Sequence, residues 1–217
     1  MSSTSVPFGN SASFTVLKSS GLFFLLWGNF KFTETKIKDL YIIEPEVFKD
    51  KRGYFFESYN ENDFRNYNKD INLNFVQDNE SNSKKGVLRG LHYQEKHAQD
   101  KLVRVISGKI FDVAVDLRKD SETYLQWVGV ILSSTNKKQF YIPKGFAHGF
   151  LVLSDHASFV YKCTDIYDPS SEGGIPWNDE TVAVDWPKLD CEYKTSEKDG
   201  KHPGFKEQSF DWAERWL

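Results

Sequence analysis

The sequence lacks several features that mark common protein classes. Cys163 and Cys191 are its only cysteines and form no Cys-x-x-Cys pair, so no disulfide framework is specified. Lysine and arginine total 28 against 31 acidic residues, and this formal net charge of -3 argues against a nucleic-acid-binding surface. The apolar run 22–27 is too short to cross a bilayer. We therefore expect a protein that binds neither nucleic acid nor membrane, and the few cysteines favour a reducing, cytoplasmic location.

Aromatic residues, in contrast, are abundant. They make up 16% of the chain, with 18 phenylalanines, 10 tyrosines and 6 tryptophans. Such rings populate the inner faces of sheets and the walls of ligand pockets. The length of 217 residues, 39% of them hydrophobic, predicts one domain with a sizeable core.

The first 32 residues differ from the rest of the chain. They are rich in serine, glycine and phenylalanine, and regular patterning starts near Phe32. We expect an N-terminal extension over residues 1–32, either disordered or lying on the surface, and a single domain over residues 33–217. A secretion signal is disfavoured because Lys18 is the only cation before the apolar run.

Short segments with a period of two follow one another from residue 39 at spacings near ten residues. They comprise residues 40–43, 53–58, 74–78, 102–106, 111–117, 127–132, 139–142, 150–153 and 158–164. Many short strands at this spacing, without a long helix, predict an all-β sandwich or barrel.

The connections between these segments are polar or carry glycine. Ser107-Gly108-Lys109 predicts a hairpin turn between 102–106 and 111–117. Residues 60–69 predict a short helix or a loop. Residues 209–216 predict a short C-terminal helix, with Ser209 as its N-cap.

The segment Gly86-Val87-Leu88-Arg89-Gly90-Leu91-His92-Tyr93-Gln94 carries two chemically useful side chains. In a straight strand Arg89 and His92 would point to opposite faces, because three residues separate them. Gly86 and Gly90 offer places for a bulge that aims both into one cavity. A guanidinium suits a phosphate and an imidazole suits proton transfer. By itself, a histidine in such a strand is more often structural.

The segment Pro143-Lys144-Gly145-Phe146-Ala147-His148 resembles a turn of cupin-type jelly rolls that aims its histidine into the barrel. This raises a metal hypothesis, with His92, His97 and His148 as one conceivable ligand set. Metal cupins, however, carry a His-x-His pair, and this sequence reads His92-Tyr93-Gln94 instead. We therefore expect no metal.

The alternation in 158–164 places Phe159, Tyr161 and Cys163 on one strand face. A tyrosine on an inward face needs a partner for its hydroxyl. A core tyrosine bonded to a carbonyl therefore stays open as an alternative to a catalytic one.

Eight segments together resemble the dTDP-4-dehydrorhamnose 3,5-epimerase family, in order and in spacing, over about residues 33–200. These segments are Glu44-Pro45; Arg52-Gly53-x-Phe55-Phe56-Glu57-Ser58; Phe75-Val76-Gln77-Asp78-Asn79; Val87-Leu88-Arg89-Gly90-Leu91-His92-Tyr93-Gln94; Lys101-Leu102-Val103-Arg104; Phe111-Asp112-Val113-Ala114-Val115-Asp116-Leu117-Arg118; Ile142-Pro143-x-Gly145-Phe146-Ala147-His148-Gly149-Phe150; and Tyr161-Lys162 through Trp177-Asn178-Asp179.

The resemblance implies a cupin-like jelly roll (a double-stranded β-helix) with short peripheral helices, a homodimer, and no metal or other cofactor. It implies an isomerase of dTDP-rhamnose biosynthesis that inverts C3 and C5 of dTDP-4-dehydro-6-deoxy-D-glucose to give dTDP-4-dehydro-L-rhamnose. Both carbons flank the C4 ketone, so loss of either proton gives an enolate.

The resemblance also assigns residues. His92 is the base, Tyr161 the acid, Asp199 the carboxylate partner of the histidine, and Lys101 the cation that steadies the enolate oxygen. Among the substrate contacts, the two arginines match pyrophosphate ligands and Tyr167 matches a ring that stacks on thymine. The substrate-binding residues are Arg52, Glu57, Gln77, Asp78, Asn79, Arg89, His148, Tyr167, Glu172 and Lys198.

Two parts of the chain depart from the family pattern. The extension before Phe32 has no counterpart in it, and the segment after Pro187 matches poorly. Lys198 and Asp199 are therefore placed by a short Ser-x-Lys-Asp pattern alone. The alternatives are an epimerase acting at C3 or C5 alone, a keto-isomerase, a non-catalytic sugar-nucleotide-binding module and a metal cupin oxygenase.

Overall fold

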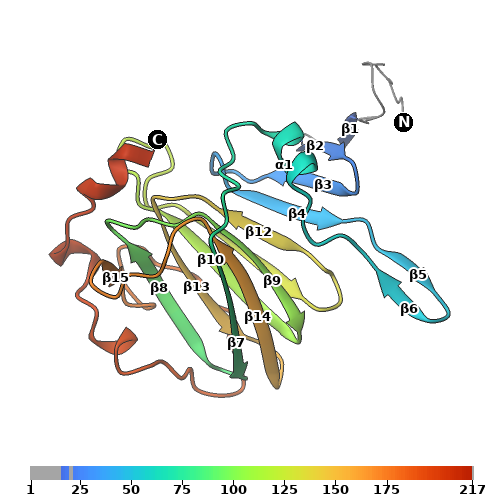
Figure 1. Ribbon diagram of the computed structural model, residues 1–217. Helices are drawn as coiled ribbons and strands as arrows, with labels where there is room; N and C mark the ends of the chain where they lie inside the picture. Colours follow the sequence, from blue (N-terminus) through green and yellow to red (C-terminus); the bar gives the residue numbers. More distant parts are fainter. Residues whose placement is uncertain (1–15, 20–21, 217) are drawn as a thin grey trace.

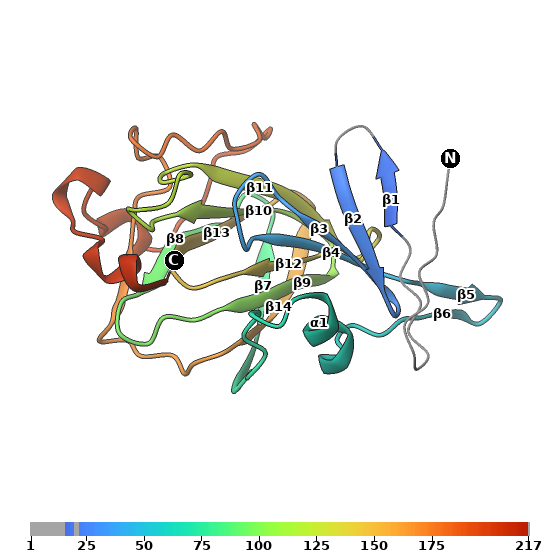
Figure 2. The same ribbon diagram turned by 90° about the horizontal axis from the view of Figure 1, so that it is seen from above.

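The computed structural model describes residues 16–19 and 22–216 and forms two antiparallel sheets that face each other (Figures 1 and 2). The eight-stranded sheet contains, in spatial order, β1 (Val16–Ser19), β2 (Leu22–Trp27), β3 (Phe30–Glu34), β4 (Tyr41–Pro45), β12 (Gln139–Ile142), β9 (Lys101–Ser107), β14 (His156–Cys163) and β7 (Gln77–Lys84). The five-stranded sheet contains β11 (Trp127–Ser133), β10 (Lys109–Asp116), β13 (Phe146–Val152), β8 (Leu88–Gln94) and β15 (Glu172–Gly174). A separate hairpin, β5 (Phe48–Asp50) with β6 (Gly53–Phe55), projects from one edge (Figure 1).

The main core lies between the two sheets. Val103, Phe140 and Phe159 enter it from the eight-stranded sheet, while Ile110 and Phe150 enter it from the five-stranded sheet. Each such side chain contributes about 1.5–3 kcal/mol when it leaves water. Alternation along β14 supplies such an inward face, whereas β10 turns its mixed face inward and its apolar face toward the C-terminal segment. The predicted all-β class is confirmed.

The outer faces of both sheets are also covered. The helix α1 (Glu61–Tyr67) buries Phe64 against the eight-stranded sheet. The C-terminal segment, with the 3-10 helices η1 (Asp199–Lys201), η2 (Phe205–Glu207) and η3 (Asp211–Trp216), packs Phe210 and Ala213 against the five-stranded sheet. The packing of the C-terminal segment matters for function because it places η1 in contact with β8, although the two elements are far apart in the sequence.

The predicted hairpin at residues 107–109 is wrong. Strand β9 pairs with β12 and β14, whereas β10 pairs with β11 and β13 in the other sheet. Gly108, with φ of +79°, instead makes a tight turn that carries the chain from one sheet to the other. An alternating pattern of apolar and polar residues indicates the extent of a strand, but it does not identify the strand that pairs with it in the sheet.

Several element boundaries differ from the sequence-based expectation. Strand β7 begins at Gln77 and extends to Lys84, beyond the predicted 74–78. The C-terminal helix is the 3-10 helix η3, and the Ser209 hydroxyl accepts a hydrogen bond from the Asp211 N–H at 3.4 Å. No helix of residues 16–19 and 22–216 is long and apolar enough to cross a membrane.

Part of the predicted N-terminal extension belongs to the eight-stranded sheet. Strands β1 and β2 lie at its edge, and β3 already begins at Phe30. Phe30 and Phe32 are fully buried beneath α1. Residues 1–15 and 20–21 lie outside the described residues, so the predicted division at residue 32 stays a prediction.

Candidate active site

A β-bulge in β8 brings Arg89 and His92 to the same cavity, as the two glycines predicted. His92 lies opposite His148 of β13. Arg89 lies opposite Phe150, so β8 advances three residues where β13 advances two. Gly90 has φ of +122°, and a Cβ there would lie 2.6 Å from the β13 backbone. Only glycine fits this bulge without displacing β13.

A cavity of about 330 Å³ gathers nine of the fourteen predicted site residues. His92 reaches it from the five-stranded sheet, while Lys101 and Tyr161 reach it from the eight-stranded sheet. The nine residues are Gln77, Asn79, Arg89, His92, Lys101, His148, Tyr161, Tyr167 and Glu172. Other lining residues, which the sequence did not single out as site residues, are Ser81, Gln99, Gly149, Phe150 and Phe159.

Asp199 holds the imidazole of His92. Its Oδ1 lies 2.7 Å from Nε2 of His92, and its side chain is only 5% exposed. Burial alone would raise the pKa of Asp199, but the hydrogen bond and charge of His92 outweigh burial and hold that pKa below its usual value. An ionised carboxylate can only accept, so Nε2 carries the hydrogen and Nδ1 keeps a lone pair that can take a proton.

A second imidazole–carboxylate pair lies deeper in the barrel. Nε2 of His148 lies 2.9 Å from Oδ1 of Asp112, which is fully buried. Burial raises the pKa of Asp112, against the opposing effects of His148 and Lys101. Within the alternating segment 111–117, Asp112 lies on the polar face, and the sequence did not single it out as a site residue. That polar face turns inward here, so the pair shapes the cavity floor.

Lys101 places a cation beside the cavity. Burial lowers the pKa of its amine, while Cys163, Asp112 and Glu172 oppose the shift. Within the described residues it makes no hydrogen bond or ion pair. An unpaired ammonium in a partly dry site interacts strongly with negative charge that develops on a substrate.

Tyr161 reaches the cavity beside Phe159, with ring centroids 5.4 Å apart. Burial raises the pKa of its phenol, and the charge of Arg89 partly offsets this effect. The hydroxyl therefore stays protonated near neutral pH. Arg89 itself donates to Oγ of Ser83 from Nε and Nη2, at 3.3 and 3.2 Å. This contact fixes the guanidinium beside the phenol.

Four predicted binding residues form a connected group at the cavity edge. The Tyr167 hydroxyl donates to Oε2 of Glu172 at 2.5 Å, and Lys198 pairs with the same oxygen. The Tyr167 backbone N–H donates to Oε1 of Gln77 at 2.9 Å. The bond to Glu172, with burial, raises the pKa of Tyr167 to about 12. The exposed Tyr167 ring is thus held at the edge of the cavity.

Three other predicted binding residues lie away from this cavity. Arg52 lies at the turn of the β5–β6 hairpin and is 84% exposed. Glu57 accepts a hydrogen bond from Nδ2 of Asn29 at 2.7 Å. Asp78 pairs with Lys162 on the outer face of β7. Its side chain points outward because successive residues of a strand alternate in direction, and its neighbours Gln77 and Asn79 line the cavity. Motif order in the sequence carried no information about these directions.

The alternative metal triad of His92, His97 and His148 is not assembled among the described residues. His97 lies outside the cavity, beside the partly exposed carboxylate of Asp165. The group whose ligand atoms do converge is His92, Asp199 and His202. His202 carried no signal in the sequence. Burial lowers the pKa of its imidazole, which is therefore neutral near pH 7.

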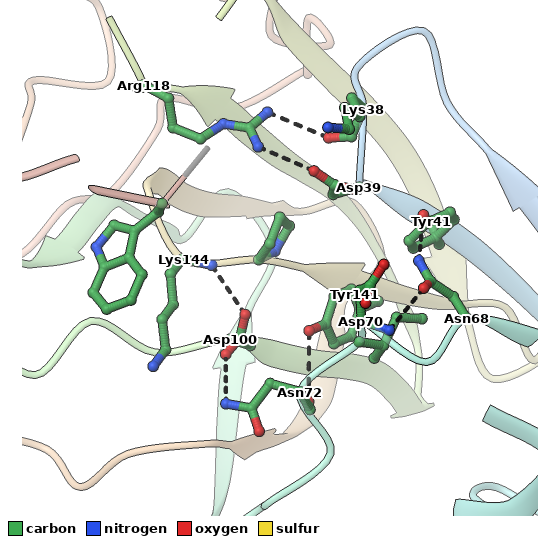
Figure 3. Close-up of a pocket in the computed structure, with 13 residues that line it drawn as sticks. Lys38, Asp39, Tyr41, Asn68, Asp70, Asn72, Asp100, Arg118, Tyr141 and Lys144 are labelled. Atoms are coloured by element: carbon green, nitrogen blue, oxygen red, sulfur yellow. Dashed lines mark hydrogen bonds and ion pairs between the residues drawn. The ribbon is translucent and has the colours of Figure 1, made fainter. Parts of the chain in front are cut away.

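A second cavity of about 460 Å³ contains none of the predicted site residues (Figure 3). Its polar groups bind one another. Arg118 donates to Oδ2 of Asp39 at 3.4 Å. Asp100 accepts from the Lys144 backbone N–H at 3.2 Å and from Nδ2 of Asn72 at 3.2 Å. The predicted proton-transfer residues His92 and Tyr161 line the first cavity instead.

Comparison with known proteins gives the family. The sequence model of the dTDP-4-dehydrorhamnose 3,5-epimerase family matches residues 34–207. The chain belongs to this family. The epimerase of Methanothermobacter thermautotrophicus is 56% identical over 158 residues, which cover 73% of this chain and 84% of the relative. That of Pseudomonas aeruginosa is 53% identical over 175 residues, which cover 81% and 96%.

Solved structures agree with this assignment. The crystal structure of dTDP-6-deoxy-D-glucose-3,5-epimerase from Legionella pneumophila, in complex with dTDP-4-keto-L-rhamnose, gives a TM-score of 0.81. It is 49% identical in sequence, and the match covers 84% of this chain and 96% of that chain. The predicted cupin-like jelly roll is confirmed, and the protein is an isomerase of the epimerase type.

Proposed function

We propose that this epimerase inverts C3 and C5 of dTDP-4-dehydro-6-deoxy-D-glucose and produces dTDP-4-dehydro-L-rhamnose for dTDP-rhamnose biosynthesis. The observation that carries the proposal is that His92 and Tyr161 reach one cavity from opposite sheets. Inversion requires a base on one face of the sugar ring and an acid on the other. Two proton-handling groups on facing sheets supply that arrangement.

Each inversion proceeds in two proton transfers. Nδ1 of His92 takes the proton from the carbon next to the ketone, and the electron pair of the C–H bond moves to O4 as an enolate. Tyr161 then donates its phenolic proton to the other face of the same carbon, and the electron pair returns from oxygen. Solvent reprotonates the phenolate and removes the proton from His92. The same sequence at the second carbon gives the product.

Lys101 is the group that we assign to the enolate. Its ammonium is enclosed by protein and has no partner among the described residues, so its charge is available to the developing oxyanion. A preorganised donor of this kind lowers the barrier by roughly 3 kcal/mol. Asp199 acts through His92, because it fixes the tautomer and stabilises the imidazolium that forms.

The nucleotide is assigned to the groups around the cavity opening. Arg89 offers a guanidinium suited to a pyrophosphate oxygen. Gln77 and Asn79 offer amides that can pair with the thymine edge. Tyr167, held by Glu172, offers a ring on which thymine can stack, a contact worth about 1–3 kcal/mol in comparable nucleic-acid sites.

Arg52 supports a homodimer. As a pyrophosphate ligand it would have to reach a cavity, yet its own hairpin projects away from the chain's sheets (Figure 1). The same hairpin exposes Phe48, Tyr54 and Phe55, which a partner would cover. A two-fold dimer that lays this hairpin over the partner's cavity meets both requirements. No metal or other cofactor is required by the proposed steps, and the cytoplasmic location stays a prediction.

The deciding experiment is incubation with dTDP-4-dehydro-6-deoxy-D-glucose in deuterated water, followed by NMR. We expect deuterium at both C3 and C5, together with the spectrum of dTDP-4-dehydro-L-rhamnose. Label at one carbon with inversion there alone would identify a single-carbon epimerase. Formation of a 3-keto product would identify a keto-isomerase. Saturable dTDP binding without any label would leave only a binding module.

A further inference from the structure

His202 has an unsatisfied nitrogen directed at the catalytic pair. Its Nε2 is buried without a hydrogen-bond partner, and its side chain is only 9% exposed. That nitrogen lies 3.9 Å from Oδ1 of Asp199, too far for a hydrogen bond. Buried polar atoms are normally paired, so an orphan of this kind calls for an explanation. The proposed proton transfers do not use it.

The imidazole occupies a slot that the neighbouring strand leaves open. A Cβ on Gly174 of β15 would lie 2.4 Å from Nε2 of His202, so a larger residue would displace the ring. The ring also meets His92 edge to face, with centroids 5.8 Å apart. His202 is therefore held close to both members of the pair.

Three ligand atoms converge at this point. His92, Asp199 and His202 each offer one, and all lie within 4.8 Å of one another. Two imidazoles and a carboxylate form a donor set that Zn²⁺ and its first-row neighbours accept. Metal–ligand bonds of about 2.0–2.2 Å put tetrahedral ligands about 3.4 Å apart.

The observed geometry is close to this requirement. The distance from Nε2 of His92 to Oδ1 of Asp199 is 2.7 Å and that from Oδ1 of Asp199 to Nε2 of His202 is 3.9 Å, one shorter and one longer than this value. All three ligand atoms lie within 4.8 Å of one another, so side-chain rotations that shorten the longer separations would enclose an ion. The nearby positive charge of Lys198 is offset by its ion pair with Glu172.

We propose that His92, Asp199 and His202 form a reversible site for a divalent transition metal such as Zn²⁺, and that its occupancy inhibits the enzyme. The inhibitory part rests on the proposed role of His92. A metal on Nε2 leaves the hydrogen on Nδ1, so the imidazole has no lone pair for the substrate proton. The same ion also withdraws Asp199 from its supporting role.

The test uses the full chain after treatment with a chelator. ZnCl₂ is titrated while epimerisation is measured, and CoCl₂ is titrated while the visible absorption of tetrahedral Co²⁺ is followed. We expect one ion per chain, loss of activity, and recovery with EDTA. His202→Phe keeps an aromatic ring in the slot without a ligand. It should weaken inhibition and Co²⁺ binding roughly tenfold or more, since even outer partners of metal ligands are worth that much.

Matched variants make the result specific. His202→Gln is a second variant if His202→Phe does not fold, and both should retain metal-free turnover. His97→Gln removes a partly exposed histidine outside the cavity and should leave the metal response unchanged. Inhibition that is equally strong in the His202 variants, or no metal binding at all, would overturn the proposal. If Co²⁺ binding needs His202 in a protein that shows no epimerisation, the metal site stands and the proposed function falls.

Discussion

Nε2 of His92 lies 2.7 Å from Oδ1 of Asp199, although 107 residues separate them in the chain. The contact forms because the C-terminal segment returns across the five-stranded sheet and sets η1 against β8. The backbone of Gly90, which makes the bulge, also bonds to the Asp199 carboxylate. One local distortion of β8 therefore positions both the imidazole and its partner.

Asp199→Asn should keep the fold and remove most of the activity. The amide can donate to Nε2 of His92, which moves the hydrogen to Nδ1 and removes the lone pair of the base. We expect kcat to fall by roughly 10²–10⁴-fold with little change in KM. Steady-state kinetics measures both. Asp165→Asn, beside His97 and outside the cavity, serves as the control, and a kcat for Asp199→Asn within threefold of wild type would contradict the positioning role.

Tyr161→Phe should separate proton removal from inversion. The variant keeps His92, so exchange of the C3 hydrogen with deuterated water should continue, but reprotonation from the opposite face should fail. We expect label at C3 with little product inverted at C5, read by NMR. Tyr93→Phe removes another buried hydroxyl, bonded to Gln208 outside the cavity, and should behave as wild type. An undiminished product yield from Tyr161→Phe would exclude the phenol as the acid.

Lys101→Met should change activity and stability in opposite directions. A buried ammonium without a partner is costly, so its replacement by an apolar chain of similar length should raise the free energy of unfolding by about 1 kcal/mol. Loss of the enolate's cation should lower kcat/KM by roughly 10²–10³-fold. Urea unfolding measures the change in the free energy of unfolding, and steady-state kinetics measures the change in kcat/KM. If the variant were less stable and still active, Lys101 would be a structural residue.

The bulge in β8 shows what the sequence could predict. Gly86 and Gly90 indicated where β8 could distort to aim Arg89 and His92 into one cavity, because glycine permits the distortion that their spacing requires, and the bulge forms at Gly90. The alternation of side chains along residues 158–164 likewise predicted that Phe159 and Tyr161 share one face, since alternation is a local property of a strand.

Other features depend on contacts that no local pattern encodes. The turn at Gly108 was predicted as a hairpin because its composition is that of a turn, yet the choice of sheet is made by packing between distant strands. Asp78 was grouped with its inward-facing neighbours because motif order does not record side-chain direction. His202 was missed because its position depends on Gly174 and on how the C-terminal segment crosses β8.

Mixing two inactive variants should restore activity if the hairpin of one chain completes the site of the other. Arg52→Ala lacks the donated arginine and His92→Ala lacks the base, so each homodimer should be impaired. After unfolding and refolding together, about a quarter of the sites should hold both wild-type residues. A mixture of His92→Ala with Tyr161→Phe is the control, because both residues belong to one chain's cavity. Recovery no greater than in that control would place Arg52 outside the site.

Asp116 supports stability through a buried ion pair that should be lost in acid. Its carboxylate accepts from Nε and Nη2 of Arg118 at 2.9 and 3.0 Å, and both side chains are buried. Burial alone would raise the pKa of Asp116, but the bonds from Arg118, Ser121 and Thr123 outweigh it and hold that pKa below its usual value. A depressed carboxyl pKa stabilises the fold above the unfolded value, and this contribution disappears as pH falls through the folded value.

Asp116→Asn should therefore lower the free energy of unfolding by about 3 kcal/mol at neutral pH, because it leaves the Arg118 guanidinium buried without its counter-charge. The difference from wild type should shrink as pH falls below about 4, where the unfolded carboxyl binds a proton. Urea unfolding of both proteins at neutral pH and through the acid range measures this difference in the free energy of unfolding. Asp39 contacts Arg118 at 3.4 Å and is partly exposed, so Asp39→Asn should lower the free energy of unfolding far less. A difference that stays constant through the acid range would show that the charge of Asp116 contributes nothing to stability.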